Sequence, residues 1–184
     1  MKIVLGISGA SGAIYGIKIL EELKKFNVET HLLISKWGEY TIQKETTYSI
    51  EQIKKLSDVY YEIDDLAARI SSGSFKTDGM IVAPCSMKAL GGIANGFNTD
   101  LIMRTADVCI KEKRKLLLLT RETPLSTIHL ENMLKLSQSG VLIMPPVPAF
   151  YTAPKSINDL VMQTVGRVLD YFGIEIPELI RWNE

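Results

Sequence analysis

The stretch Gly6-Ile7-Ser8-Gly9-Ala10-Ser11-Gly12 decides the fold of this 184-residue chain. It follows the apolar run Ile3-Val4-Leu5 and leads into apolar residues at helical spacing from Ala13 onward. This order predicts a strand, a tight glycine-rich loop and a helix, which together make the first half of a βαβ unit. Because glycines let the backbone approach an anion and the N–H groups of a helix start point toward it, the loop predicts a phosphate site.

The spacing of the loop narrows the choice of ligand. The glycines read G-x-x-G-x-x-G rather than the dinucleotide pattern G-x-G-x-x-G, and the hydroxyls of Ser8 and Ser11 stand among them. We therefore expect one phosphate, bound with help from hydroxyl groups, whereas a plain tight connection is the alternative interpretation of the loop alone. The next predicted strand, 28–35, ends in Ser35 without an acidic residue for a dinucleotide ribose, which favours a mononucleotide such as FMN.

Length and composition set limits on the class of protein. With 46% hydrophobic residues, the chain fits one compact domain over 1–184. The balance of 21 basic and 21 acidic residues argues against a nucleic-acid-binding or membrane-binding surface. No apolar run approaches the roughly 20 residues of a membrane span. Cys85 and Cys109 form no C-x-x-C pair and no His/Cys cluster has zinc spacing, so we expect no structural metal, no disulfide framework and a cytoplasmic location.

The remaining elements alternate between strands and helices. We expect strands at 28–35, 59–63, 79–84, 115–120 and 141–144, and helices at 13–26, 37–44, 51–56, after Ser86, and at 99–111, 126–137 and 156–172. Asn98 or Thr99 is the expected cap of the helix 99–111. The alternation predicts an α/β fold, a single-domain Rossmann-like or flavodoxin-like doubly wound parallel sheet that binds ligands at the carboxyl ends of its strands. We expect the tail 173–184 to dock on that site or to gate it.

The residues that follow the predicted strands should therefore converge. They are Gly9-Ala10-Ser11, Ser35, Cys85-Ser86-Met87-Lys88, Arg121-Glu122-Thr123 and Pro145 to Tyr151. They provide hydroxyls and backbone donors for a phosphate, one Arg/Glu pair and an apolar proline-aromatic segment, but neither a histidine nor a nucleophile–base pair. This set predicts a site for a flavin and for an apolar partner with an anionic end.

Several of these residues have a second interpretation. Arg121 and Glu122 would otherwise form a surface salt bridge. Cys85 is either a buried thiol or a thiolate activated by a helix start. His31 and His129 are expected to be structural, because neither follows a predicted strand.

With these residues in view, the sequence resembles the UbiX/Pad-type flavin prenyltransferases, formerly described as aromatic-acid decarboxylases. The segments that carry the resemblance are 6–12, 83–90 (Ala-Pro-Cys-Ser-Met-Lys-Ala-Leu), 93–96, 121–126 (Arg-Glu-Thr-Pro-Leu-Ser), 129–133 and 144–151 (Met-Pro-Pro-Val-Pro-Ala-Phe-Tyr). They run in order through nearly the whole chain, and together they are specific.

The resemblance implies a metal-independent transfer of a dimethylallyl group from dimethylallyl monophosphate to N5 and C6 of reduced FMN. The product, prenylated FMN, would serve a UbiD-type decarboxylase, and the enzyme would be a dodecamer with sites where three subunits meet. By resemblance, the residues that bind FMN are Gly9, Ala10, Ser11, Ser35, Ser86, Met87, Lys88, Ala89 and Arg121. Those that bind the allylic phosphate, some of them from adjacent subunits, are Arg104, Lys111, Tyr151 and Arg167. Ser11, Glu45 and Glu122 would handle protons, and Trp182 would provide an aromatic wall.

Two other functions compete with this one. The flavin-dependent cysteine decarboxylases share the strand-end Pro-x-Ser and the pattern at 95–100, Asn-Gly-Phe-Asn-Thr-Asp. They typically read P-A-S-A-N-T, however, where this chain reads Pro-Cys-Ser-Met-Lys-Ala at 84–89, and their catalytic histidine has no matching position here. The third hypothesis is a non-catalytic FMN-binding assembly module, which would need no phosphate-binding set beside the flavin.

Overall fold

The computed structural model describes residues 1–177 and 179–182 and contains one six-stranded sheet. Every pairing in the sheet is parallel, and the strand order is β3-β2-β1-β4-β5-β6. The strands are β1 (Lys2–Ile7), β2 (Glu29–Ile34), β3 (Val59–Tyr61), β4 (Gly79–Cys85), β5 (Lys115–Thr120) and β6 (Leu142–Ile143). The predicted single-domain doubly wound fold is therefore confirmed, and its strand order is that of the Rossmann-like alternative.

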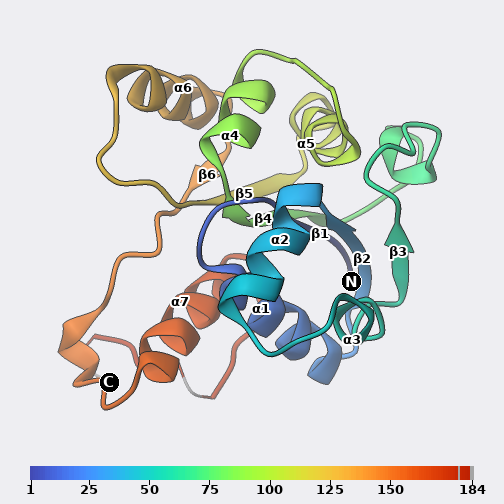
Figure 1. Cartoon of the computed structure of the whole chain (residues 1–184). Helices are drawn as coiled ribbons and strands as arrows, with labels where there is room; N and C mark the ends of the chain where they lie inside the picture. Colours follow the sequence, from blue (N-terminus) through green and yellow to red (C-terminus); the bar gives the residue numbers. More distant parts are fainter. Residues whose placement is uncertain (178, 183–184) are drawn as a thin grey trace.

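Helices cover both faces of the sheet (Figure 1). They are α1 (Ala13–Lys25), α2 (Lys36–Glu45), α3 (Ile50–Lys54), α4 (Met87–Ala94), α5 (Leu101–Lys111), α6 (Thr127–Gln138) and α7 (Ile157–Tyr171), with short 3-10 turns η1 (Arg69–Ser71) and η2 (Phe150–Thr152). Helices α1 and α7 pack together on one face, and α4 packs with α5 and α6 on the other. The strand order reverses between β1 and β4, which lead to α1 and α4 on opposite faces.

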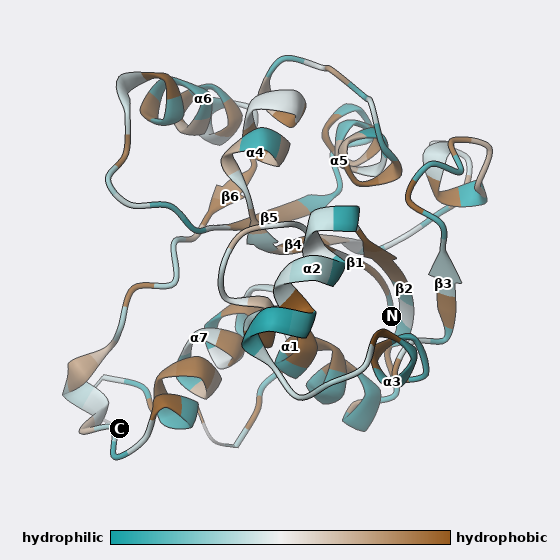
Figure 2. Ribbon diagram, in the orientation of Figure 1, coloured by the Kyte–Doolittle hydropathy of each residue, from teal (hydrophilic) through white to brown (hydrophobic). Residues whose placement is uncertain are grey.

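The central strands are buried on both faces, as the four consecutive leucines of β5 require. Leu117 and Leu119 pack into the cluster under α1 and α7, whereas Leu116 and Leu118 pack into the cluster under α4 and α5. Figure 2 shows the same division, with hydrophobic strands between helices that present hydrophobic residues inward. The sheet is therefore packed between two hydrophobic clusters, one on each face.

The structure differs from the predicted boundaries in two ways. Asp100, rather than Asn98 or Thr99, caps α5 by accepting a hydrogen bond from Met103 N at 2.9 Å. Asn98 instead donates to Asp107 at 3.1 Å. Strands β3 and β6 are shorter than expected because they lie at the two edges of the sheet and pair with one neighbour each.

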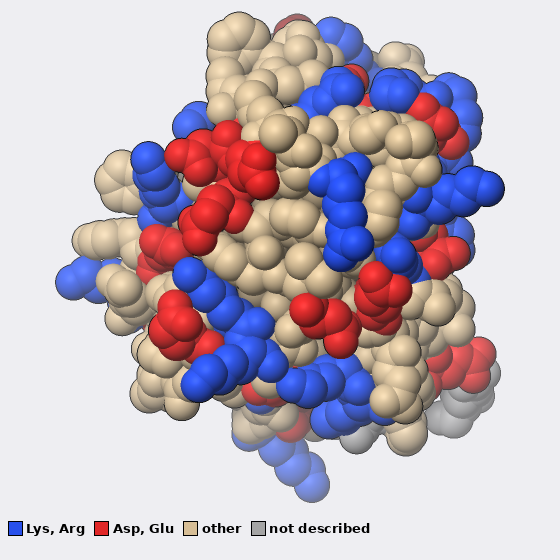
Figure 3. All heavy atoms as spheres, turned by 90° about the vertical axis from the view of Figure 1, so that its right-hand side faces the viewer, with Lys and Arg blue, Asp and Glu red and all other residues tan. Residues whose placement is uncertain are grey.

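Charges of both signs are interspersed on the side of the molecule where β3 and α3 lie in Figure 1 (Figure 3). Among the described helices, none has the length and apolar character needed to cross a membrane. No group of three or more His, Cys, Asp or Glu side chains within residues 1–177 and 179–182 is arranged to hold a metal ion.

Gly16 marks the closest approach of α1 to the sheet. A Cβ at this position would clash with the carbonyl oxygen of Ala83 and lie 2.9 Å from Cγ1 of Ile7. We expect Gly16→Ala to lower the free energy of unfolding by about 1–3 kcal/mol, the usual cost of overpacking, in urea denaturation.

The matched control is Gly91→Ala, which makes the same change in the interior of α4. There the nearest atom to the new Cβ is Nδ2 of Asn132 at an ordinary 3.7 Å. Since the unfolded chain loses conformational freedom, this variant should be unchanged or more stable by about 0.4–1 kcal/mol. Equal losses in the two variants would contradict the assigned clash.

Candidate functional site

The hydroxyl of Ser8 joins the ends of β1 and β4. Its Oγ donates to the carbonyl oxygen of Pro84 at 2.7 Å and accepts from Ser86 N at 2.8 Å. Ser8 N also donates to Pro84 O, at 3.2 Å, and the residue is only 3% exposed. The expectation that this hydroxyl helps to bind a phosphate is therefore wrong, because both strand ends already use it.

The start of α1 is held by a carboxylate. Oε2 of Glu45, the last residue of α2, accepts from Gly12 N at 2.8 Å and from Ala13 N at 3.1 Å. The expectation that these N–H groups face a ligand phosphate is therefore also wrong. Glu45 supplies the negative charge at this helix start, and it ties α2 to the glycine-rich loop.

The starts of α2 and α4 converge on a pocket of about 400 Å³ at the carboxyl edge of the sheet. Ser35 caps α2 by accepting from Gly38 N at 3.0 Å, and Ser86 caps α4 by accepting from Ala89 N at 3.2 Å. A hydroxyl that accepts in this way keeps its own hydrogen for a ligand, and the first amides of each helix have no acceptor within the helix. The predicted residues that line this pocket are Gly9, Ser35, Ser86, Lys88 and Ala89. Two helix starts and their capping hydroxyls therefore border one pocket.

Sequence reasoning missed several residues of this pocket, namely Lys36, Trp37, Ile63, Asp64, Thr99, Asp100, Ile102 and Met103. Asp64 follows β3, so the rule of examining each strand end could have found it. Trp37 is 65% exposed and meets the ring of Tyr40 edge to face at 5.7 Å. A Cβ on Gly9 would clash with the Cβ of Trp37, so this glycine is required where the loop passes under α2.

A second pocket of about 550 Å³ opens beside Ser11 and Gly12, and Arg121 and Glu122 line it together with Pro145–Pro148. The salt bridges among the described residues do not include one between Arg121 and Glu122, so the surface-salt-bridge interpretation is wrong. Tyr15 also lines this pocket; burial raises the pKa of its phenol, while the charge of Arg121 acts in the opposite direction. A cation, a carboxylate, a hydroxyl and an apolar wall thus meet in one place.

Two further predicted residues lie outside the lining of both pockets. Ala10 is 8% exposed, and Met87 packs against the core under α4 and α5. Cys85 is fully buried, and burial raises the pKa of its thiol to about 12. The thiol therefore stays protonated near neutral pH, which removes the thiolate alternative.

Both histidines have structural contacts, as the sequence predicts. The buried ring of His31 lies 3.0 Å from Glu29 Oε1 and 2.9 Å from the hydroxyl of Tyr61, and burial lowers its pKa. His129 forms a capping box with Ser126 at the start of α6.

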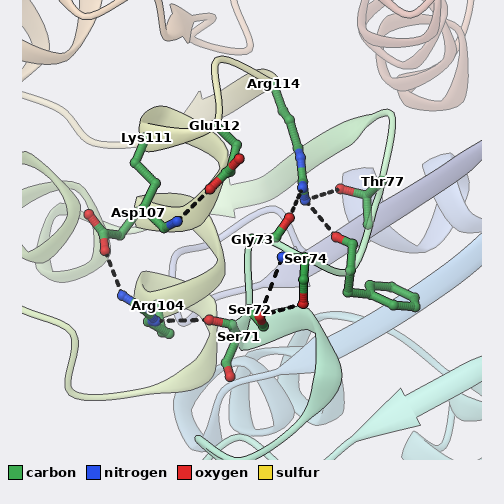
Figure 4. A network of polar contacts seen from close by, with 11 residues as sticks. Ser71, Ser72, Gly73, Ser74, Thr77, Arg104, Asp107, Lys111, Glu112 and Arg114 are labelled. Atoms are coloured by element: carbon green, nitrogen blue, oxygen red, sulfur yellow. Dashed lines mark hydrogen bonds and ion pairs between the residues drawn. The ribbon is translucent and has the colours of Figure 1, made fainter.

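Arg104 and Lys111 lie on α5 (Figure 4), and neither is among the residues that line the two pockets. Arg104 donates to Ser71 O at 3.1 Å and pairs with Asp107 at 2.9 Å. Lys111 pairs with Glu112 at 2.5 Å. These two cations form an ordered polar surface with η1 and the loop that follows it.

Tyr151, Arg167 and Trp182 belong to the opposite face of the sheet, where α7 lies. The rings of Tyr151 and Trp182 meet edge to face, with centroids 5.2 Å apart. Arg167 lies on α7, 3.7 Å from Asp170. One copy of the chain therefore does not bring the four predicted donor-binding residues together, because two are on α5 and two are at η2 and α7.

The comparisons with known proteins agree with this geometry. The flavoprotein family model matches residues 1–169. The chain is 58% identical over 182 residues to the mitochondrial flavin prenyltransferase PAD1 of Saccharomyces cerevisiae, covering 99% of this chain and 75% of that protein. It is 54% identical over 183 residues to a probable UbiX-like flavin prenyltransferase of Bacillus subtilis, covering 100% and 90%.

Solved structures give the same result. The crystal structure of AnUbiX (PadA1) in complex with FMN and dimethylallyl pyrophosphate matches with a TM-score of 0.98 at 54% identity, over 100% of this chain and 97% of that one. A dodecameric FMN-dependent UbiX-like decarboxylase from Escherichia coli O157:H7 matches equally, with a TM-score of 0.98 at 54% identity over all of both chains. Peptidyl-cysteine decarboxylase EpiD, at 19% identity and a TM-score of 0.63 over 80% of this chain and 82% of that one, shares the fold alone.

The two pockets fit a flavin enzyme, since one has two helix starts and the other has a cation and a carboxylate. Over nearly the whole chain, more than half of the residues are identical to those of flavin prenyltransferases. The chain belongs to the flavoprotein family and, within it, to the UbiX-like flavin prenyltransferases.

Proposed function

We propose that this chain joins the dimethylallyl group of dimethylallyl phosphate to N5 and C6 of reduced FMN. The observation that carries the proposal is the pair of pockets on either side of the loop Ser8–Gly12. One pocket offers helix starts and hydroxyls to a phosphate, and the other offers charged groups beside an apolar wall. Two substrates that react with each other would bind in adjacent sites of this kind.

FMN fits the first pocket. The hydroxyls of Ser35 and Ser86 and the first amides of α2 and α4 would bind its phosphate, with Lys88 adding positive charge. The closely packed Gly9, Ala10, Met87 and Ala89 would let the flavin approach the backbone, and Arg121 would contact it from the second pocket. Reduced FMN, when bound, supplies the nucleophilic ring atoms.

The second pocket fits the donor. Pro145–Pro148 would keep water from the dimethylallyl group while its bond to phosphate breaks. Arg121 would offset the charge that develops on the phosphate, so that no metal ion is needed. Glu122 and Ser11 would take the proton from C6, with Glu45, fixed at the start of α1, sharing the proton handling.

The site is completed by further copies of the chain. The phosphate and the prenyl group would be surrounded by residues from several copies. One neighbour would supply Arg104 and Lys111, and the same chain or another would supply Tyr151, Arg167 and Trp182. Helix α6 supports such an assembly, because Leu136 is the only fully buried residue of its twelve. Ile128, Leu130 and Leu134 of α6 are 69%, 51% and 59% exposed, which indicates a surface that another copy covers. We propose a homo-dodecamer, as in the Escherichia coli O157:H7 relative.

A UbiD-type decarboxylase would receive the prenylated FMN, in line with the resemblance of the sequence. We place the reaction in the cytoplasm, and the two free, buried thiols of Cys85 and Cys109 support a reducing compartment. The yeast relative is by name mitochondrial.

The proposal predicts a covalent flavin product. The purified chain, incubated without oxygen with reduced FMN and dimethylallyl phosphate, should release a flavin heavier than FMN by one dimethylallyl group, as measured by mass spectrometry. Incubation without the donor is the control. Unmodified FMN as the only flavin recovered would overturn the proposed function.

Glu122→Gln should keep FMN and lose turnover. The substitution preserves the size of the side chain and its acceptor for Thr123 N, which lies at 3.0 Å from Oε1, but removes the base. Since general-base catalysis contributes about 10²–10⁴-fold, we expect kcat to fall by at least about 100-fold with FMN affinity unchanged. Glu51→Gln, the same change at an exposed position of α3, should keep full activity. A normal rate in Glu122→Gln would exclude Glu122 as the base.

The assembly surface predicts a change in mass. Leu134→Glu places a charge on the exposed apolar side of α6 and should shift the protein to smaller species in light scattering after size exclusion, without loss of helical circular dichroism. Gln43→Glu, which adds a carboxylate at an exposed position of α2 instead, should keep the wild-type mass. An unchanged assembly in Leu134→Glu would show that α6 is not an interface.

A further inference from the structure

Residues 179–182, called here the C-terminal segment, lie along one side of α7. Gln163, Arg167 and Asp170 are spaced i, i+4 and i+7 and therefore share that side of the helix. Gln163 contacts the backbone of Ile180, and Asp170 pairs with Arg181 at 2.7 Å.

Gln163 has three polar contacts although it is only 5% exposed. Its Nε2 donates to the hydroxyl oxygen of Tyr151 at 3.1 Å and to Ile180 O at 2.9 Å. Its Oε1 accepts from Ile180 N at 3.3 Å. One buried amide thus links the C-terminal segment, η2 and α7, and its loss would leave several of these groups without partners.

The contact with Gln163 also orients the hydroxyl of Tyr151. Because the amide supplies a hydrogen to the phenol oxygen, the hydrogen of the phenol must point elsewhere. It points to Ile180 O at a long 3.4 Å, a weak bond that a phosphate oxygen could replace. The ring is 47% exposed, so an anion can reach it.

The same arrangement affects the neighbouring cation. Arg181 makes two contacts with the carboxylate of Asp170, at 2.7 and 3.4 Å, while Arg167 lies 3.7 Å from it. The closer pairing of Arg181 leaves the guanidinium of Arg167 only loosely held, and its side chain is 57% exposed. Trp182 of the segment thus lies against the Tyr151 ring, and Arg167 lies on the side of α7 that carries Gln163.

We propose that Gln163 is a positioning residue for the allylic phosphate donor. It fixes the direction of the Tyr151 hydroxyl and holds the segment that carries Trp182 against the Tyr151 ring. The inference rests on the proposed function and adds to it a residue that touches neither substrate. It also assigns the C-terminal segment a defined role, as one wall of the donor site.

The test uses Gln163→Leu, which removes the amide and keeps much of the volume. We expect the KM for dimethylallyl phosphate to rise about tenfold, while kcat changes less and FMN affinity is unchanged. In a Tyr151→Phe background the same substitution should raise the KM by a smaller factor, because the part that acts through that hydroxyl is already lost. Gln43→Leu, the same change at an exposed position of α2, should leave all three quantities as in the wild type.

A second measurement is independent of turnover. Trypsin cleaves after Arg181, and intact mass spectrometry reports loss of residues 182–184 from the full chain. Cleavage should be faster in Gln163→Leu than in the wild type or Gln43→Leu, because the segment is no longer held. This readout also shows whether Gln163→Leu is folded, since a folded variant is cut at this bond before others.

Three outcomes would overturn the proposal. An unchanged donor KM in Gln163→Leu would separate Gln163 from donor binding, and an equal rise in the wild-type and Tyr151→Phe backgrounds would separate it from the Tyr151 hydroxyl. An unchanged rate of cleavage after Arg181 in Gln163→Leu would show that Gln163 does not hold the C-terminal segment. A wild-type chain that forms no adduct would overturn the proposed function and the donor role, while faster cleavage in the variant would still support the link itself.

Discussion

One buried hydroxyl group, that of Ser8, holds together the two strand ends from which the ligand edge is built. Strands β1 and β4 lead to helices on opposite faces of the sheet, so their ends are where the loops separate and a crevice forms. Ser8 bonds Pro84 O and Ser86 N across this point. The glycine-rich loop and the start of α4 are therefore placed relative to each other before any ligand binds.

The fold was predictable wherever a run of hydrophobic residues is long enough to be compatible with only one kind of element. The leucines 116–119 of β5 allow no arrangement but burial on both faces, and the alternation of strands and helices follows from such runs. The cap of α5 was not predictable, because Asn98, Thr99 and Asp100 are all good capping residues and tertiary contacts choose among them. Asn98 is engaged by Asp107 of the following helix, which leaves Asp100 for the cap.

The site was predictable to the extent that strand ends define it. That rule brings Ser35, Ser86 and Lys88 to one pocket and Arg121 and Glu122 to the other. It fails where the partner of a polar group is distant in sequence, since Ser8 bonds a carbonyl 76 positions away and Glu45 reaches amides 32 and 33 positions away. The donor-binding residues on α5 and α7 came from the resemblance to a family, because no spacing rule joins elements on opposite faces.

The carboxylate at the start of α1 has a consequence for where anions bind. The starts of α1, α2 and α4 lie at this edge of the sheet, and the unpaired amides of a helix start attract a phosphate. Glu45 occupies one of them from within the chain, so the other two, α2 and α4, are left to compete for an external anion. The carboxylate of Glu45 thus satisfies the amides at the start of α1 from within the chain, whereas the starts of α2 and α4 face the pocket.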